Sequence, residues 1–359
     1  MNNRKIEESK LLWHMDRVED YFRLGKKVSP ICIDMGITKK CNINCCYCYG
    51  NFQGGKTGEV LNRAPLFDVF DNAYKLGIRA IAVVGDGEPT LNPHLYEALE
   101  RGKKTGLSLA LSTNGILLDN EERQRNILNN CDWMRFNLSA GNSNSYEFIH
   151  NSKSFNKVVE NIASLVKLKE KTKSKCDIGI QSVYIPRLMD SDMVELACLS
   201  IGMGVDYFLI KQCCQPDKGE SGMFQFDLNE YNTKKTHDLF SLLSHLTSPK
   251  TEIIVKAEAM QTDCRKFKKC LDLPFLFQIS GNGKCYPCGY LFNNPKYEYG
   301  DLNKQKLEEI LKSDRYWKVI KDIANNFDVK TDCRGHCRHN KTNEFIDNYL
   351  NKPESINFI

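Results

Sequence analysis

The chain has 359 residues, 41% of them apolar, and a formal net charge of +5 at pH 7. This length fits one α/β barrel plus a smaller domain, and because no run of about 18 apolar residues is present, we expect a soluble protein with no membrane partner. The mild charge gives no indication of a nucleic-acid partner, and sixteen cysteines without a secretory signal favour thiols that bind metal or react in the reducing cytoplasm over a disulfide scaffold.

Residues 1–30 predict a helical extension whose amphipathic helix ends near Gly25. Beyond it, apolar or β-branched runs alternate with segments of helical length. The expected strands cover 31–38, 78–84, 107–112, 133–140, 177–185 and 205–211, and the expected helices between them cover 64–76, 93–105, 119–130, 154–170 and 190–203. This alternation predicts an α/β domain over residues 31–261, with a parallel sheet and right-handed crossovers. Periodicity alone leaves open whether the sheet closes.

The composition of the sequence changes from about residue 262. Cysteines reappear at positions 264, 270, 285, 288, 333 and 337. Two short strands are expected around Gly281 and Gly283, and a helix is expected over residues 304–324. These features predict a small, cysteine-dependent domain over residues 262–341, followed by a tail over residues 342–359.

Three closely spaced cysteines follow the first expected strand. Cys41, Cys45 and Cys48 have CxxxCxxC spacing, and Cys46 stands outside that pattern. A 4Fe–4S cube needs one ligand for each iron, so three thiolates leave one iron open. The alternative is a zinc knuckle, although structural zinc normally takes four closed ligands. The spacing, with Tyr47 just before the last cysteine, resembles the radical S-adenosylmethionine (radical SAM) superfamily, whose members bind the amino and carboxylate groups of SAM at the open iron.

The resemblance implies a partial (β/α)6 TIM-type barrel, in which the active site lies at the carboxyl ends of the strands. The second expected strand is followed by a turn that resembles the family's GGEP motif, which meets the SAM amino group. That turn consists of Gly85, Asp86, Gly87, Glu88 and Pro89. In the family, SAM is also touched near the positions that correspond here to Ser112, Asn114, Asn137, Ser139 and Gln181. Ordinary turns and strand ends are the alternative interpretation of all these residues.

The sixth expected strand ends in Lys211, Gln212, Cys213 and Cys214. On the barrel interpretation, a thiol here could donate a hydrogen atom to a substrate radical, and Lys211 could hold a substrate oxygen. Free cysteine is also among the residues that are most often simply buried.

The cysteine-rich segment resembles the auxiliary-cluster domains of the same superfamily, called SPASM or, in a shorter form, twitch. The resemblance rests on Gly283 and on four cysteines that would close every iron of a second 4Fe–4S cluster. These four are Cys270, Cys288, Cys333 and Cys337, with Cys264 and Cys285 as possible substitutes. A zinc ribbon is the alternative. A full SPASM domain has further cysteines, so one auxiliary cluster is expected.

Residues 50–57, GNFQGGKT, match the phosphate-binding GxxxxGK[ST] loop. That loop needs a strand before it and a helix after it, and here it follows the cluster cysteines. We therefore expect no nucleotide triphosphate site.

The resemblance implies reductive cleavage of SAM to a 5′-deoxyadenosyl radical that abstracts a hydrogen atom, with an electron donor such as flavodoxin or ferredoxin as partner. The shortened cluster domain, and 30 initial residues too few for a peptide-recognition domain, favour a small, carbohydrate-type substrate, which would be oxidised or epimerised. The alternatives are modification of a ribosomally made peptide and a non-catalytic metal-binding scaffold.

Overall fold

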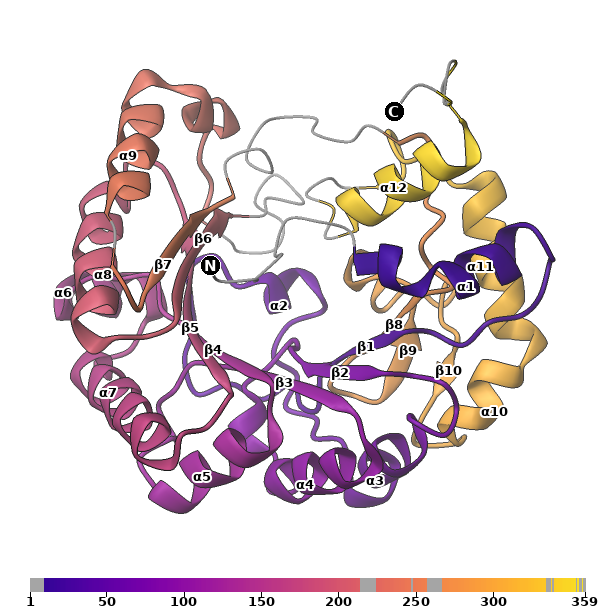
Figure 1. Ribbon diagram of the computed structural model, residues 1–359, viewed down its shortest axis with the longest axis horizontal. Helices are drawn as coiled ribbons and strands as arrows, with labels where there is room; N and C mark the ends of the chain where they lie inside the picture. The colour runs from indigo at the N-terminus through magenta and orange to yellow at the C-terminus, as the bar shows by residue number, and fades with distance from the viewer. Residues whose placement is uncertain are drawn as a thin grey trace.

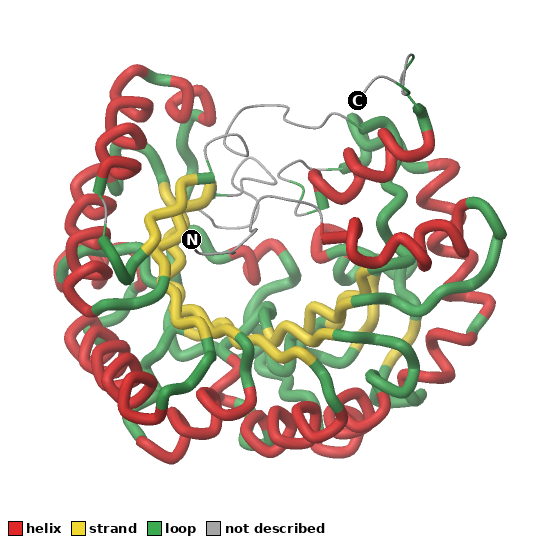
Figure 2. Tube along the Cα trace, in the orientation of Figure 1, coloured by secondary structure: helices red, strands yellow, loops and turns green. Residues whose placement is uncertain are grey.

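The computed structural model describes residues 10–213, 224–246, 248–256, 267–333, 337, 339–352, 354 and 357. Its centre is one strongly curved sheet with helices along the convex side and the short α2 on the concave side (Figures 1 and 2). None of the helices in these ranges is both long and apolar enough to cross a membrane.

The sheet has ten strands in the order β10-β9-β8-β1-β2-β3-β4-β5-β6-β7. Neighbours from β8 through β7 run parallel, and β9 and β10 are antiparallel to their neighbours. The strands are β1 (Cys32–Met35), β2 (Ala80–Val83), β3 (Ser108–Thr113), β4 (Trp133–Asn137), β5 (Asp177–Tyr184), β6 (Tyr207–Gln212), β7 (Glu252–Val255), β8 (Leu276–Ile279), β9 (Lys284–Tyr286) and β10 (Gly300–Asp301). The expected mixed α/β fold is thus confirmed, and all six expected strands are present.

The helices of the convex side follow the expected alternation. They are α3 (Arg63–Asn72), α4 (Leu95–Thr105), α5 (Glu121–Asn130), α6 (Ser143–His150), α7 (Phe155–Thr172), α8 (Asp190–Met203) and α9 (Lys234–His245). The others are α1 (Met15–Phe22), α2 (Tyr49–Phe52), α10 (Leu307–Lys312), α11 (Asp314–Asn326) and α12 (Asn340–Leu350). The sequence did not predict α2, α6, α9 or α12.

The amino-terminal helix and the helix expected over 304–324 differ from their predictions. The first begins as a 3-10 turn, Lys10–His14, and continues as α1, which ends three residues before Gly25. The second is split at Ser313, whose extended backbone ends α10 and whose hydroxyl accepts a hydrogen bond from the backbone N–H of Tyr316, at 3.1 Å, to begin α11. A serine that favours an N-cap therefore overrides the continuous helical pattern.

The cysteine-rich segment shares the sheet of the α/β domain. Strand β8 pairs with β1 in parallel, with Cys32 opposite Leu276 and Met35 opposite Ile279. Strand β7, which was not predicted, extends the other end of the sheet beyond β6. The expected domain boundary at residues 261 and 262 lies outside the described residues, so the domain limits stay a prediction.

The two faces of the sheet differ in polarity. On β5, the hydroxyl of Ser182 contacts Met193 of α8 and the hydroxyl of Tyr184 donates to Asp190 at 2.7 Å, so these residues face the helices. Because successive side chains in a strand alternate, Gln181 faces the concave side, and the strand register places Asn137 and Lys211 on that face as well. The concave face of the described sheet carries Asp34, Ser112, Arg135, Asn137, Gln181, Lys211 and Gln278. The convex face is apolar and forms the main core.

Candidate active site

The cluster loop, residues 36–48, joins the carboxyl end of β1 to α2 and gathers Cys41, Cys45 and Cys48. Burial, followed by the neighbouring thiols of Cys48 and Cys41, raises the pKa of Cys45 well above its usual value. Burial also raises the pKa of Cys41, with Cys48 among the smaller causes. The three thiols are thus electrostatic neighbours, although among the described residues no three His, Cys, Asp or Glu side chains converge on a single ion.

This chemistry fits the positively charged core of an iron–sulfur cluster. Buried neighbouring thiols resist ionisation, and a bound metal centre supplies the positive charge that makes thiolates favourable there. Lys56 also favours the thiolate forms, because its positive charge lowers the pKa of both Cys41 and Cys45. Its ammonium is held within the loop, where it donates to the backbone carbonyl of Ile43. Lys56 belongs to the GNFQGGKT segment, which begins within α2 and does not directly follow a strand.

Cys46 is anchored differently from the three cysteines around it. Its backbone N–H donates to the carbonyl of Ile149, at 2.8 Å, at the end of α6. Burial raises the pKa of its thiol to about 11. Its exclusion from the ligand set stays a prediction.

The backbone of the turn after β2 is in close contact with the backbone of the cluster loop. A Cβ on Gly85 would lie 2.4 Å from Gly36 Cα, and a Cβ on Gly87 would lie 2.3 Å from the carbonyl oxygen of Thr38. Both distances are too short for any side chain. The glycines of this motif therefore allow two backbone segments to touch, which places the acidic residues of the turn beside the cluster cysteines.

Asp86 connects the turn to the cysteine-rich segment. Its carboxylate accepts hydrogen bonds from the Ser280 hydroxyl, at 2.6 Å, and from the Gly281 N–H, at 2.9 Å. The buried ammonium of Lys39 lies 3.8 Å away. Both oxygens thus have protein partners, although the sequence grouped Asp86 with the residues that bind SAM.

Glu88 is buried at the centre of the site. One carboxylate oxygen accepts from the hydroxyls of Thr90 and Thr113, each at 2.6 Å, and the other accepts from the Asn114 N–H at 2.7 Å. Burial raises the pKa of Glu88, and these hydrogen bonds oppose that shift. The charge of Glu88 in turn raises the pKa of Cys41, so the carboxylate lies next to the cluster loop.

A hydrogen-bonded group links the cluster loop to β4 and β5. The Tyr47 hydroxyl lies 2.7 Å from the Ser139 hydroxyl and accepts from the Asn137 amide at 3.2 Å. Ser139 also accepts from the Val183 N–H at 2.9 Å and donates its own backbone N–H to Nε2 of His150 at 3.1 Å. Tyr47 therefore contacts two of the residues predicted to lie near SAM, Asn137 and Ser139.

The remaining predicted residues are divided between the concave face and the core. Ser112, Gln181 and Lys211 lie on the concave face, and Asn114 donates its side-chain amide to Asn42 of the cluster loop at 2.6 Å. Cys213 is fully buried in the main core, and its backbone N–H donates to the Tyr231 hydroxyl at 2.9 Å. Cys214 lies outside the described residues, as does Cys264.

The structure brings together the four cysteines predicted for the auxiliary site. Burial raises the pKa of Cys270 well above its usual value, and Asp272 and the three other thiols add to the shift. Those thiols belong to Cys288, Cys333 and Cys337. The pKa of Cys285 is also raised by burial, but the charges next to it are Asp301 and Glu298. The donor set fits a cluster held by the first four, and Cys285 lies apart from them.

His150 and Lys56 are site residues that the sequence analysis missed. Burial lowers the pKa of His150 to about 3, so its ring is neutral. The available signal was an N-cap, Asn142, followed by apolar residues at helical spacing. In the sequence, Lys56 stood out only as part of the GNFQGGKT segment, for which we expected no nucleotide site.

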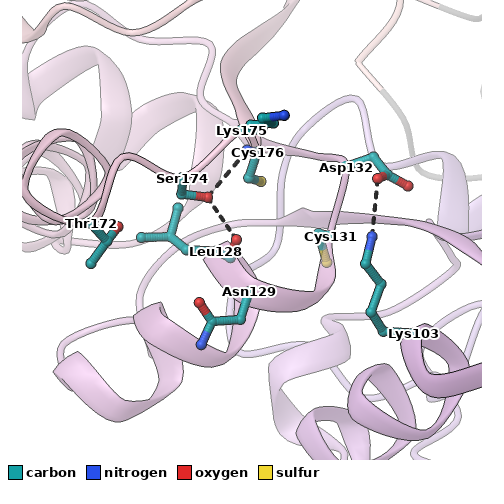
Figure 3. A pocket seen from close by; sticks show the side chains of 9 residues that line it. All are labelled: Lys103, Leu128, Asn129, Cys131, Asp132, Thr172, Ser174, Lys175 and Cys176. Carbon is teal, nitrogen blue, oxygen red and sulfur yellow. Dashed lines mark hydrogen bonds and ion pairs between the residues drawn. The ribbon is translucent and has the colours of Figure 1, made fainter.

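A separate pocket of about 360 Å³ lies at the amino-terminal ends of β4 and β5 (Figure 3). Cys131, Cys176 and the ion pair between Lys103 and Asp132, at 3.3 Å, form part of its lining. In a parallel sheet this is the opposite end from the cluster loop, so the pocket is not part of the site.

The curved parallel sheet and its two cysteine sets define an iron–sulfur protein of the partial-barrel class. A model of the radical SAM superfamily matches residues 35–198, and a model of the SPASM iron–sulfur cluster-binding domain matches residues 270–338. The chain therefore belongs to the radical SAM superfamily and carries a SPASM-type domain. Its cofactors are SAM and 4Fe–4S clusters.

The chain is similar to three proteins that bear on function. The chain is 24% identical over 336 residues to the tungsten-containing aldehyde ferredoxin oxidoreductase cofactor-modifying protein of Pyrococcus furiosus, covering 88% of this chain and 91% of that protein. It is 23% identical over 137 residues to the mycofactocin maturase MftC of Mycobacterium ulcerans, covering 38% and 37%. The crystal structure of Streptococcus suis SuiB bound to the precursor peptide SuiA has a TM-score of 0.63 and 13% identity, covering 86% of this chain and 71% of SuiB.

Proposed function

We propose that this radical SAM enzyme abstracts a hydrogen atom from a peptide or protein substrate that binds along the concave face. The observation that carries the proposal is the position of the cluster loop, which lies at the carboxyl ends of strands whose concave face is polar. When bound, SAM and the cluster supply a 5′-deoxyadenosyl radical. The work of the chain is to orient SAM and substrate and to exclude water.

The proposed SAM site lies between the cluster loop and β2–β5. Glu88 would accept a hydrogen bond from the SAM ammonium, because its second oxygen accepts one hydrogen bond, from the Asn114 N–H, and a carboxylate oxygen can accept two. Asn137 and Gln181, which are paired across β4 and β5, would meet the ribose and carboxylate with their amides. Tyr47 holds Asn137 in place.

A peptide is favoured over the carbohydrate that the sequence suggested. SuiB shares the fold over most of this chain and was crystallised with a precursor peptide, and MftC is described as a maturase. Lys211, on the concave face of β6, is proposed to bind a substrate carbonyl or carboxylate oxygen.

We further propose oxidation rather than epimerisation. Epimerisation needs a hydrogen-atom donor facing the substrate. Of the two predicted donors, Cys213 has its thiol enclosed in the core, and Cys214 lies outside the described residues. In an oxidation, the substrate loses one hydrogen atom to the adenosyl carbon, one proton to solvent, and one electron to an iron–sulfur acceptor. A one-electron donor of the flavodoxin or ferredoxin class would supply the first electron.

The experiment uses anaerobically reconstituted protein with SAM and dithionite, and offers it peptide or carbohydrate fractions from cells grown in deuterated medium. We expect deuterium in 5′-deoxyadenosine with the peptide fraction only. Labelling from the carbohydrate fraction would overturn the peptide assignment. Absence of SAM cleavage, matched by the Cys41, Cys45 and Cys48 triple Ala variant, would instead indicate a non-catalytic scaffold.

The oxidation is tested separately by turnover in deuterium oxide with the substrate fraction found above. The expected product is two hydrogens lighter than the substrate and carries no solvent deuterium at the reacting carbon. Incorporation of one deuterium without a change in oxidation state would show epimerisation, and Ala variants of Cys213 and Cys214 would then locate the donor.

A further inference from the structure

We propose that His150 donates a hydrogen bond to the sulfur of Cys45 and thereby raises the reduction potential of the SAM-binding cluster. His150 is the last residue of α6 and is fully buried. Its Nδ1 lies 3.1 Å from the Sγ of Cys45, and its Nε2 lies 3.1 Å from the backbone nitrogen of Ser139. The proposal rests on the assignment of Cys45 as a cluster ligand.

The position of the ring proton follows from the partner on the far side of the ring. The backbone N–H of Ser139 can only donate, so Nε2 of His150 must accept and cannot carry a proton. A doubly protonated imidazolium accepts at neither nitrogen. The ring of His150 is therefore neutral, its one proton is on Nδ1, and Nδ1–H points at the sulfur of Cys45. A backbone amide thus selects the tautomer, which is a known way of fixing a histidine next to a metal ligand.

The backbone holds this contact on both sides of Cys45. The N–H of Asn44 donates to the carbonyl of His150 at 3.1 Å, and the N–H of Cys46 donates to the carbonyl of Ile149 at 2.8 Å. Two backbone hydrogen bonds therefore join the end of α6 to the cluster loop.

Aromatic rings hold the imidazole of His150 from two other directions. The Tyr146 ring lies 4.4 Å from it, centroid to centroid, and the Tyr47 ring meets it edge-on at 5.9 Å. The two backbone hydrogen bonds and the two ring contacts together therefore hold the donor in place.

The electronic consequence follows from the charge that reduction adds. One electron makes the cluster and its thiolates more negative, so a donor aimed at a thiolate sulfur stabilises the reduced form more than the oxidised form. Hydrogen bonds to the sulfurs are among the factors that set iron–sulfur potentials, and the dry surroundings of His150 strengthen the effect. His150 is thus a positioning residue that acts through Cys45 and makes the cluster easier to reduce.

Two substitutions separate the two nitrogens of the ring. In His150→Asn, the side-chain amide reaches the position of Nδ1 and can still donate to Cys45. In His150→Gln, it reaches the position of Nε2, where its oxygen accepts from Ser139 but nothing donates to the sulfur. Tyr146→Phe is the matched control, because it removes a neighbouring hydroxyl and leaves the imidazole and the ring beside it in place.

The readout is the midpoint potential of the SAM-binding cluster, followed by electron paramagnetic resonance during an anaerobic redox titration without substrate. Ala variants of the auxiliary cysteines provide the background, so that one cluster is observed. We expect a lower potential for His150→Gln, and wild-type potentials for His150→Asn and Tyr146→Phe. An unchanged potential in His150→Gln would overturn the proposal. Because no substrate is present, failure of the peptide assignment would not affect this result.

A second measurement covers variants that fail to fold or to hold a cluster. The ¹⁵N chemical shifts of ring-labelled His150 in the wild-type protein, read before and after reconstitution, report which nitrogen carries the proton. Protonated Nδ1 with unprotonated Nε2 supports the proposal. The opposite tautomer would overturn it, whatever the variants do.

Discussion

Glu88 shows how one side chain can serve both the fold and the site. Its buried carboxylate joins the turn after β2 to the turn after β3 through Thr113 and Asn114. A charge in this position is stable only because donors surround it. Nearly all of its bonding capacity is used inside the protein, so substitution should affect stability before it affects chemistry.

Glu88→Gln should lower the free energy of unfolding by about 1–3 kcal/mol, because the new NH₂ group faces a donor wherever it turns. Thermal unfolding of the protein measures this change. The exposed Glu160 of α7 provides the control, and Glu160→Gln should leave the midpoint unchanged. Equal midpoints for the two variants would contradict the structural role.

The same variant tests the SAM assignment. If Glu88 also meets the SAM ammonium, loss of a charge-assisted hydrogen bond of about 1.5–3 kcal/mol weakens SAM binding roughly tenfold or more. Equilibrium dialysis with reconstituted protein measures this affinity. Unchanged binding in a folded Glu88→Gln variant would leave Glu88 with its structural role alone.

Cys176 illustrates the difference between a thiol near a pocket and a reactive thiol. Burial raises its pKa to about 12, so only about one ten-thousandth of it is thiolate at pH 8, and the thiolate is the reactive form. We expect iodoacetamide to label the exposed Cys198 much faster than Cys176, and the Cys176 rate to rise tenfold per pH unit. Peptide mass spectrometry measures both rates, and comparable labelling at pH 8 would contradict this view.

At the scale of elements, the backbone of the turn after β2 packs directly against the backbone of the cluster loop. Gly85 and Gly87 let the turn touch the backbone of the cluster loop, and Gly281 does the same from the turn between β8 and β9, where a Cβ would lie 2.3 Å from Thr38. Two turns therefore converge on residues 36–40. The spacing of the cysteines relative to Glu88 depends on this contact.

Gly85→Ala should destabilise the protein by about 1–3 kcal/mol, because the added methyl group meets the rigid backbone of Gly36. Gly202→Ala in α8 is the matched control, since nothing lies within 4 Å of its Cβ position. Alanine there should stabilise the helix by about 0.5–1 kcal/mol. Thermal midpoints of the two variants should thus move in opposite directions, and a stabilising Gly85→Ala would refute the close-approach argument.

At the scale of the whole molecule, the two cysteine sets share one sheet. Strand β8 lies between β1, which leads into the cluster loop, and β9, which leads toward Cys288. Asp86 adds a second link, because it joins the turn after β2 to Ser280 and Gly281. The SPASM-type domain is therefore an extension of the barrel sheet and not a body on a linker.

Iron content tests the two ligand sets together. The reconstituted protein should hold about eight irons, and the Cys41, Cys45 and Cys48 triple Ala variant should hold about four, as should the Ala variant of the four auxiliary cysteines. Cys285→Ala is the control and should keep about eight, because Cys285 lies apart from the other thiols. Colorimetric analysis measures the iron content of each variant. Loss of four irons in Cys285→Ala would show that the auxiliary ligand set is wrong.

The sequence by itself determined the features that depend on neighbouring residues. The strand and helix alternation follows from local periodicity, and the CxxxCxxC set is visible because its three cysteines lie within eight positions of one another. The turn after β2 and the order of the later cysteines were sufficient to indicate the family. In each case the physical constraint acts along a short stretch of chain.

Only the tertiary structure decided the contacts between distant segments. Cys45 and His150 are 105 positions apart, and Asp86 and Gly281 are 195 positions apart. Two other features also depend on contacts between distant segments. They are the pairing of β8 with β1 and the separation of Cys285 from the auxiliary cysteines. No local pattern encodes such contacts, because they form only when the whole sheet has assembled and its strand order has brought the carboxyl ends together.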